Sequence, residues 1–169
     1  LGADIVNDIW ALRRKGAESV VSGHPRCGVC LMHMHRDPQT MQVAPMQGDV
    51  VPLVSEFLRI RVSALRALNV AAERIVLDPG IGFGKTVEQN FSLLARQQEL
   101  LVEGYPLLAG WSRKSSLGAV TGHEIPRERV AASVAAHLLA VERGARIVRV
   151  HDVRETVDAL RVWQAMAGE

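Results

Sequence analysis

Five short apolar runs, rich in β-branched residues, recur along the chain and are separated by longer segments. The runs span residues 3–9, 28–34, 74–78, 106–111 and 145–151. Each run is almost continuously apolar, which is typical of strands buried on both faces of a parallel sheet. Because a segment with helical character follows each run, the pattern predicts five consecutive βα units.

The segments between the runs carry the signals of amphipathic helices. In the longest of them, Val51, Val54 and Leu58 are spaced three and four apart and share one stripe. Polar residues that favour the N-cap position stand in front of three segments, and a proline begins the remaining one. The expected helices span residues 50–69, 87–102, 126–143 and 153–167, the expected N-caps are Asp49, Thr86 and Asp152, and Gly144 is expected to end the third helix.

The repeat length indicates which parallel fold the units belong to. The chain has 169 residues, or about 34 per unit, and eight such units give about 270, close to the usual TIM barrel. We therefore predict one domain, residues 1–169, that supplies roughly the last five units of a TIM barrel, with about three units expected before it. The alternative is a complete doubly wound sheet, but that fold usually has a glycine loop after its first strand, where this chain has Asn7-Asp8.

Composition narrows the class of protein further. Hydrophobic residues make up 48% and charged residues 22%, as in ordinary globular domains. The net charge of +2 and three scattered tryptophans do not indicate a nucleic-acid-binding protein. No apolar run approaches the ~18 residues of a membrane span, and two cysteines make no disulfide framework. We expect a cytoplasmic enzyme without membrane or nucleic-acid partners.

Each predicted strand is apolar until its carboxyl end and then becomes polar. In a TIM barrel these ends form the catalytic face, and the last two loops often bind phosphate. The polar residues at the ends are, in chain order, Asn7 and Asp8, His33 and His35, Asp78, Arg113 and Lys114, and Arg149 and His151. Any one of the cations taken alone is equally consistent with a surface charge. Four of them on one rim predict an anionic, phosphorylated substrate.

Asp78 has two interpretations that the sequence leaves open. It follows the buried run Ile75-Val76-Leu77 and precedes a glycine-rich segment. A carboxylate there can accept two parallel N–H bonds from a guanidine-like or aminopyrimidine edge. The alternative is that Asp78 accepts bonds from the amides of its own loop.

Two patterns resemble other sites, but their spacing argues against them. Residues 80–86 resemble a phosphate-binding P-loop, yet Pro79 stands where that motif needs glycine. The glycines are expected instead to let the backbone approach a flat ligand, with Phe83 at its edge. Cys27, Cys30, His33 and His35 resemble a zinc site, but on a strand Cys30 points away from both histidines.

Four motifs together resemble those of the dihydropteroate synthase family. They are Leu31-Met32-His33-Met34, the glycine-rich segment 78–85 (DPGIGFGK), Gly110-Trp111-Ser112-Arg113-Lys114-Ser115, and the segment 147–153 (IVRVHDV). Val6-Asn7-Asp8-Ile9 is similar to the same family. The matches occur in order with similar gaps, so the resemblance extends over essentially all of the chain.

The resemblance implies a transferase of folate biosynthesis on a TIM barrel, usually a cytoplasmic homodimer and a target of sulfonamides. It implies that 4-aminobenzoate is joined to 6-hydroxymethyl-7,8-dihydropterin pyrophosphate, giving 7,8-dihydropteroate and pyrophosphate, with Mg²⁺ assisting. The implied pterin ligands are Asn7, Met32, Asp78, Phe83, Gly110 and Lys114, the implied 4-aminobenzoate contacts are Ser112 and Arg113, and the implied pyrophosphate pair is Arg149 and His151. Lys114, Arg149 and His151 are the residues expected to act in catalysis.

Some parts of the family pattern are missing from this chain, and other interpretations therefore stay open. The family holds its metal with an asparagine on the first barrel strand, and it adds an aspartate on the third strand and a Thr-Arg pair after the second. None of these segments is in the sequence, so no metal ligand is expected in this chain. The alternatives are a related pterin-binding methyl-transfer barrel, which has no diphosphate to hold, and an inactive truncated partner subunit.

Overall fold

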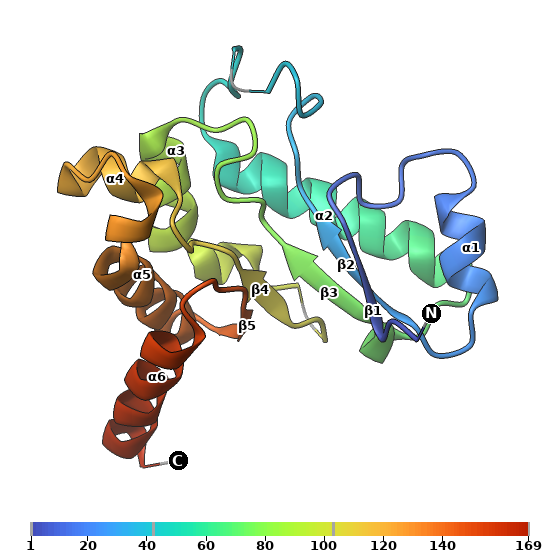
Figure 1. The fold of residues 1–169 in the computed structure, drawn as a ribbon. Coiled ribbons are helices and arrows are strands. Elements are labelled where there is room, and N and C mark those ends of the chain that lie inside the picture. Colours follow the sequence, from blue (N-terminus) through green and yellow to red (C-terminus); the bar gives the residue numbers. More distant parts are fainter. Residues whose placement is uncertain (1, 42, 103, 169) are drawn as a thin grey trace.

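The computed structural model describes residues 2–41, 43–102 and 104–168, and within them five parallel strands form one sheet. The strands are β1 (Ile5–Asp8), β2 (Gly28–Met32), β3 (Ile75–Asp78), β4 (Leu107–Ala109) and β5 (Ala145–Val148). Neighbours in the sheet are also neighbours in the chain, in the order β1-β2-β3-β4-β5 (Figure 1). A doubly wound sheet reverses its strand order, so this topology excludes that alternative and agrees with part of a barrel.

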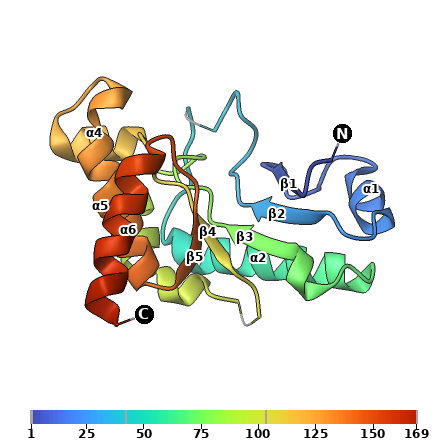
Figure 2. The ribbon, with the colours of Figure 1, turned by 60° about the horizontal axis from the view of Figure 1, so that its bottom comes forward.

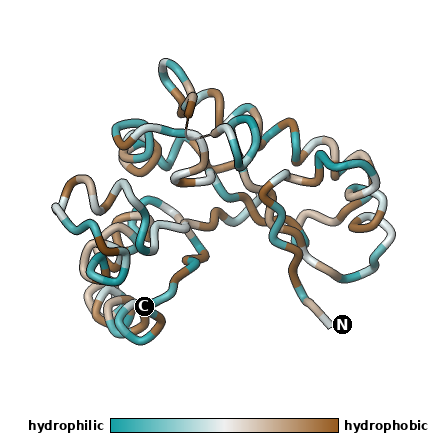
Figure 3. The backbone as a smooth tube through the Cα atoms, turned by 45° about the horizontal axis from the view of Figure 1, so that its top comes forward, coloured by the Kyte–Doolittle hydropathy of each residue, from teal (hydrophilic) through white to brown (hydrophobic). Residues whose placement is uncertain are grey.

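Helices connect the strands and wrap around one side of the curved sheet (Figure 2). They are α1 (Ala17–Gly23), α2 (Val50–Ala67), α3 (Val87–Ala95), α4 (Ser115–Thr121), α5 (Val130–Glu142) and α6 (Val153–Ala167), with short 3₁₀ turns η1 (Ala72–Arg74), η2 (Gln97–Leu100) and η3 (Pro126–Glu128). The predicted βα repeat is therefore confirmed. In Figure 3 hydrophilic and hydrophobic segments alternate along the helices, as expected when one stripe of each is buried.

Several predicted boundaries were too long, and two short helices had no predicted range. The helix expected over 87–102 ends at Ala95 and continues only as the 3₁₀ turn η2. The helix expected over 126–143 begins as the 3₁₀ turn η3, and the α-helix starts at Val130. The last strand ends at Val148 rather than at residue 151. Helices α1 and α4 have only seven residues each, too few for a clear apolar stripe.

The N-caps show which local signals were reliable. The side chain of Asp49 accepts a hydrogen bond from the N–H of Val51, and Thr86 forms a capping box with Gln89. Both predictions are confirmed. The prediction for Asp152 was wrong, because its side chain makes no cap bond and pairs with Arg113 instead.

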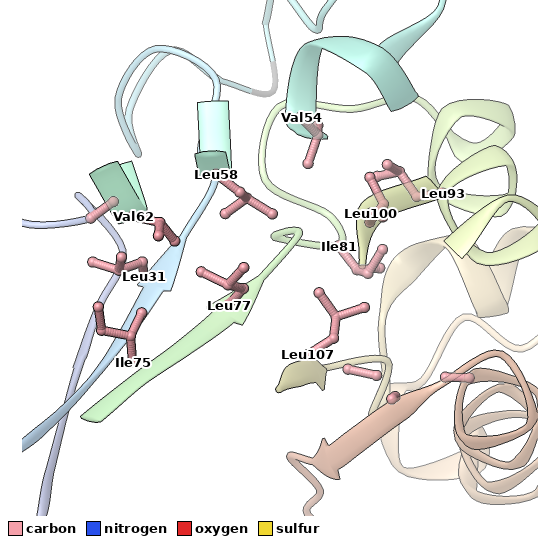
Figure 4. Close-up of a cluster of buried hydrophobic side chains, with 14 of the residues drawn as sticks. Leu31, Val54, Leu58, Val62, Ile75, Leu77, Ile81, Leu93, Leu100 and Leu107 are labelled. Atoms are coloured by element: carbon pink, nitrogen blue, oxygen red, sulfur yellow. The ribbon is translucent and has the colours of Figure 1, made fainter. Parts of the chain in front are cut away.

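The main core lies between the sheet and its helices. Leu31, Ile75 and Leu77 point from β2 and β3 toward Leu58 and Val62 of α2 (Figure 4). All five side chains are at most 6% exposed. Burying an aliphatic side chain of this size contributes about 1.5–3 kcal/mol, so this layer fixes α2 against the strands.

The opposite face of the sheet carries a smaller apolar cluster. Cys30, Val76 and Leu108 form it, with Ile147 packed beside them. These residues alternate along the strands with those of the main core, because successive side chains of a strand point to opposite faces. In a complete barrel this face lines the interior. Among the described residues, no helix is both long and apolar enough to cross a membrane.

Candidate active site

A cavity of about 300 Å³ opens at the carboxyl ends of the strands. Its lining residues follow or end all five strands, and they are Asn7, Ile9, Met32, Phe83, Gly110, Ser112, Lys114, Arg149, Val150 and His151. All of the residues predicted for the site line it, except Asp78 and Arg113. Residues from distant parts of the sequence thus meet at the face where βα barrels hold their chemistry.

The strand register explains why the polar ends converge. Asn7 is paired with Cys30, and Met32 is paired with Asp78. Residues paired across parallel strands point to the same face, and Met32 lies two positions beyond Cys30 on that face. Asn7, Met32 and Asp78 therefore all face the side of the smaller apolar cluster. Cys30 itself is buried there, on the face opposite to its neighbours Val29 and Leu31.

Asp78 is fully buried, and its two carboxylate oxygens have different surroundings. Oδ1 accepts a 2.7 Å hydrogen bond from the N–H of Gly80, so the loop interpretation holds for that oxygen. Oδ2 lies 2.9 Å from Nη1 of Arg149, whose side chain is 39% exposed. The two atoms form an ion pair without the alignment of a hydrogen bond, since neither has a hydrogen-bond partner among the described residues. Oδ2 and the guanidinium thus keep hydrogen-bonding capacity for other groups.

Gly110 makes room for this arrangement. A Cβ at that position would lie 2.7 Å from Nη2 of Arg149. The guanidinium therefore crosses the end of β4 only because no side chain is there. The cavity wall therefore needs glycine at position 110 for a steric reason, independent of any contact with a ligand.

Lys114 stands immediately before α4 and reaches back over the loop that follows β3. Its Nζ lies 4.5 Å from the centre of the Phe83 ring, within range of a cation–π contact. Burial lowers the pKa of Lys114, the Asp78 carboxylate opposes that shift, and Arg149 adds to it. A partly desolvated lysine and an aromatic ring therefore form one side of the cavity.

Ser112 and His151 form a second polar pair. The Ser112 hydroxyl oxygen accepts the backbone N–H of His151 at 3.1 Å and lies 2.9 Å from its Nδ1. Ser112 is buried, whereas His151 is exposed. The pair fixes the imidazole at the cavity beside Arg149.

Arg113 does not line the cavity, although its position was predicted to face 4-aminobenzoate. Its guanidinium makes two hydrogen bonds to Asp152, at 3.1 and 2.6 Å. The backbone of Arg113 has a left-handed φ of 58°. Its N–H donates to the Ser133 hydroxyl, and its carbonyl accepts from the buried Arg129 guanidinium. In this structure Arg113 shapes the turn that presents Lys114.

Two buried polar residues that hold the glycine loop (residues 79–85) had no role predicted from the sequence. Asn90 accepts the N–H of Gly82 and donates to the carbonyl of Thr86 and the hydroxyl of Ser116. Lys85 donates to carbonyls of the same loop. One signal pointed to Lys85: it is one of only three lysines in a chain rich in arginine.

A larger cavity, of about 500 Å³, lies between α5, β5 and α6. Apolar side chains such as Val148, Val157 and Leu160 dominate its lining, with Arg146 and Arg161 beside them. It contains none of the residues predicted for the site and no carboxylate or histidine. The smaller cavity at the strand ends is therefore the candidate active site.

The residues that the structure describes do not form a magnesium site. Across residues 2–41, 43–102 and 104–168, no group of three or more His, Cys, Asp or Glu side chains could hold a metal ion. The buried carboxylate at the cavity, Asp78, is occupied by Gly80 and Arg149. The predicted Mg²⁺ stays a prediction.

Five parallel strands in sequential order, with a cationic cavity at their carboxyl ends, define the class of (β/α) barrel domains. Within that class, the chain belongs to the pterin binding enzyme family, whose pattern matches residues 1–151.

Several characterised proteins are similar to the chain over nearly its whole length. Dihydropteroate synthase of Neisseria meningitidis serogroup B is 48% identical over 98% of this chain, which covers 59% of that protein. The structure of Burkholderia cenocepacia dihydropteroate synthase with 7,8-dihydropteroate is 56% identical, with a TM-score of 0.91 over 99% of this chain and 62% of that one. Yersinia pestis dihydropteroate synthase with a sulfonamide drug is 39% identical, with a TM-score of 0.93 over 99% and 60%. The chain thus spans about three fifths of the length of these relatives.

Proposed function

We propose that this chain carries the pterin- and diphosphate-binding face of a dihydropteroate synthase. The observation that carries the proposal is one cavity in which Asn7 and Phe83 meet Lys114, Arg149 and His151. Its volume of about 300 Å³ is at the lower end of the usual range for small-molecule sites. A slot with an aromatic edge, next to a cationic rim, suits a flat ring joined to a diphosphate.

In this reaction the amine of 4-aminobenzoate attacks the methylene carbon of 6-hydroxymethyl-7,8-dihydropterin pyrophosphate. A C–N bond forms while the C–O bond to the diphosphate breaks, the bonding electron pair leaves with pyrophosphate, and the amine loses a proton. No protein nucleophile is needed. The useful interactions are those that strengthen as positive charge develops on the methylene and negative charge on the leaving group.

The proposed roles follow the cavity wall. From the wall, Asn7, Met32, Phe83, Gly110 and Lys114 would hold the pterin, Ser112 would serve the 4-aminobenzoate side, and Arg149 and His151 would hold the pyrophosphate. Asp78, behind the wall, would also bind the pterin, and Arg113 would serve the 4-aminobenzoate side only after leaving Asp152. Since Arg149 is paired with Asp78 through an unaligned contact, diphosphate would draw the guanidinium away. Oδ2 of Asp78 would then accept an N–H from the ring, and the carboxylate would offset the developing cation.

Three further properties belong to the same proposal. Mg²⁺ would neutralise charge on the diphosphate, although no step above depends on it. The protein would be a cytoplasmic homodimer. Sulfonamides would compete with 4-aminobenzoate, and the Yersinia pestis relative, whose structure contains a sulfonamide drug, supports this.

The first test replaces Lys114 with alanine in the protein expressed from its complete coding sequence. We expect dihydropteroate formation to be abolished, because the Lys114 ammonium group lies over the Phe83 ring and lines the cavity. Lys15→Ala removes an exposed lysine and serves as the control. Normal turnover by Lys114→Ala would argue against the assignment.

Pyrophosphate binding separates this function from methyl transfer by a related barrel. The pair of Arg149 and His151 at the cavity favours the synthase, because a methyl-transfer barrel has no diphosphate to hold. Binding of inorganic pyrophosphate, measured by calorimetry, is expected for the synthase. Its absence at millimolar concentration would favour the methyl-transfer alternative.

A further inference from the structure

The glycine loop is fastened by a buried lysine that the proposed reaction does not use. Lys85 is only 5% exposed. Its Nζ lies 2.9 Å from the carbonyl oxygen of Gly80, 3.2 Å from that of Phe83 and 3.0 Å from Nδ1 of His33. Gly80 and Phe83 belong to the loop, whereas His33 directly follows β2. One side chain therefore joins two points of the loop to the neighbouring strand.

The three contacts match the protonated form of the side chain. An ammonium group has three N–H donors and no acceptor, so three acceptors satisfy it completely. A neutral amine has two N–H donors and would leave one of the three acceptors without a partner. Burial and the nearby Lys85 lower the pKa of the His33 imidazole to about 2 and keep it neutral, and in the tautomer with its proton on Nε2 its Nδ1 accepts from the ammonium group.

The fastened loop forms part of the cavity wall. Phe83 lines the cavity, and its ring lies beneath the ammonium group of Lys114. A Cβ at Gly82 would lie 3.3 Å from Cδ of Lys114, so the loop backbone also packs against the stem of that lysine. The position of the loop therefore determines where Phe83 and Lys114 stand.

We propose that Lys85, as an ammonium ion, is a positioning residue that holds the glycine loop on the end of β2 and so sets Phe83 and Lys114 for the pterin ring. The identity of the ring rests on the function proposed above. Lys85 does not line the cavity and acts only through these two residues.

The electrostatic surroundings of Lys85 make this role sensitive to pH. Burial lowers the pKa of Lys85 to about 7, while Asp78 at the end of β3 raises it and Lys114 lowers it further. The other titratable groups that face it are His33 and His35, both after β2. The charged form is therefore lost as the pH rises through about 7, and pterin affinity is expected to fall with it.

Global stability is expected to respond to Lys85 in the opposite direction. The folded pKa of about 7 lies below the ordinary value of 10.5, so the unfolded chain binds more protons between these two values. The contribution of Lys85 to the free energy of unfolding therefore rises with pH in that window. If Lys85 had only a structural role, pterin affinity would not fall in the same pH range in which its contribution to the free energy of unfolding rises.

The experiment measures binding of 6-hydroxymethyl-7,8-dihydropterin, which carries no phosphate that titrates, to the protein expressed from its complete coding sequence. For the wild type we expect affinity to fall about tenfold from pH 6 to pH 8, as the protonated fraction of Lys85 falls. Lys85→Met is expected to bind at least about tenfold more weakly at pH 6, with no such pH dependence. Lys15→Met makes the same substitution at an exposed lysine and is expected to keep the wild-type profile.

A folded Lys85→Met protein with wild-type affinity and pH profile would overturn the proposal. Should that variant not fold, His33 provides a second pair of variants. His33→Asn keeps an acceptor near the position of Nδ1 and is expected to bind like the wild type, whereas His33→Leu removes it and is expected to bind about tenfold more weakly. Equal affinity of these two variants would also overturn the proposal. A wild type that binds no pterin would instead reject the proposed function itself.

Discussion

The two walls of the cavity are built from different kinds of interaction. On one side the glycine loop donates a hydrogen bond to Asn90 and accepts one from Lys85, and both of these side chains are almost completely buried. On the other side Arg149, with a partly exposed side chain, faces the fully buried Asp78. In the first wall, backbone groups of the glycine loop form hydrogen bonds with the side chains of Asn90 and Lys85. In the second wall, Arg149 and Asp78 form an ion pair that a ligand can replace.

The difference indicates which wall sets shape and which responds to a ligand. Breaking a buried hydrogen bond on the first wall leaves a polar group unsatisfied and costs about 1–3 kcal/mol, so that wall keeps one geometry. The guanidinium of Arg149 can exchange one anion for another without such a loss. We therefore expect changes in the second wall to affect the chemical step, and changes in the first wall to affect stability and pterin affinity.

The largest effect is expected from Arg149→Met. Losing the cation that would stabilise the leaving diphosphate should lower kcat/KM for dihydropteroate formation about 100- to 1000-fold. Arg146→Met is the control, because Arg146 is an exposed residue of β5, the strand that Arg149 follows, and does not line the cavity at the strand ends. Steady-state kinetics on both folded variants test this. A loss of less than about tenfold in Arg149→Met would break the division between the two walls.

An intermediate effect, on stability, is expected from Gly80→Ala. Gly80 has a φ of 69°, and a Cβ there would lie 1.8 Å from the carbonyl oxygen of His33. The left-handed conformation costs a side chain about 1–2 kcal/mol, and the clash adds roughly 1–3 kcal/mol or more.

Gly122 offers a matched control for that substitution. It has a similar φ of 76°, but a Cβ at that position would meet no atom within 4 Å. Gly122→Ala should therefore lose only the conformational part, about 1–2 kcal/mol. Urea unfolding of the two variants measures the difference. Equal losses would show that the glycine loop yields easily and is not the fixed wall.

The smallest effect is expected from Asp152→Asn. The Arg113 guanidinium lowers the pKa of Asp152, so the pair contributes to stability above the ordinary carboxyl pKa and loses that contribution as the pH falls. Both side chains reach solvent, and added salt screens the pair. Thermal unfolding should show a smaller shift than Gly122→Ala, vanishing at high salt. A large shift that salt does not reduce would place Arg113 among the fixed elements.

Local signals in the sequence predicted the parts of the fold that depend on neighbouring residues. The apolar runs marked the five strands, and Asp49 and Thr86 marked two helix starts, because an N-cap bonds to amides only two or three residues away. The polar strand ends also predicted the rim, since parallel strands bring their carboxyl ends to one edge of the sheet.

Contacts between distant residues were beyond those signals. Asp152 was predicted as a cap, but Arg113, 39 residues earlier in the chain, takes its carboxylate. The sequence predicted a continuous helix over residues 87–102. Instead, the side chain of Gln97 donates a hydrogen bond to the carbonyl of Ala140 in α5, 43 residues away. Likewise Lys85 and His33 are 52 residues apart. Such pairings depend on how the loops fold over one another. The spacing of apolar residues within one segment does not predict them.

The packing of β2 gives the molecule a built-in chemical reporter, the thiol of Cys30. Cys27 and Cys30 are both free thiols and both buried, and burial raises the pKa of Cys30 to about 12. Only the thiolate reacts readily with alkylating reagents, so the closed sheet protects Cys30. Its rate of alkylation therefore measures how often β2 separates from its neighbours β1 and β3, a local opening that global unfolding curves average away.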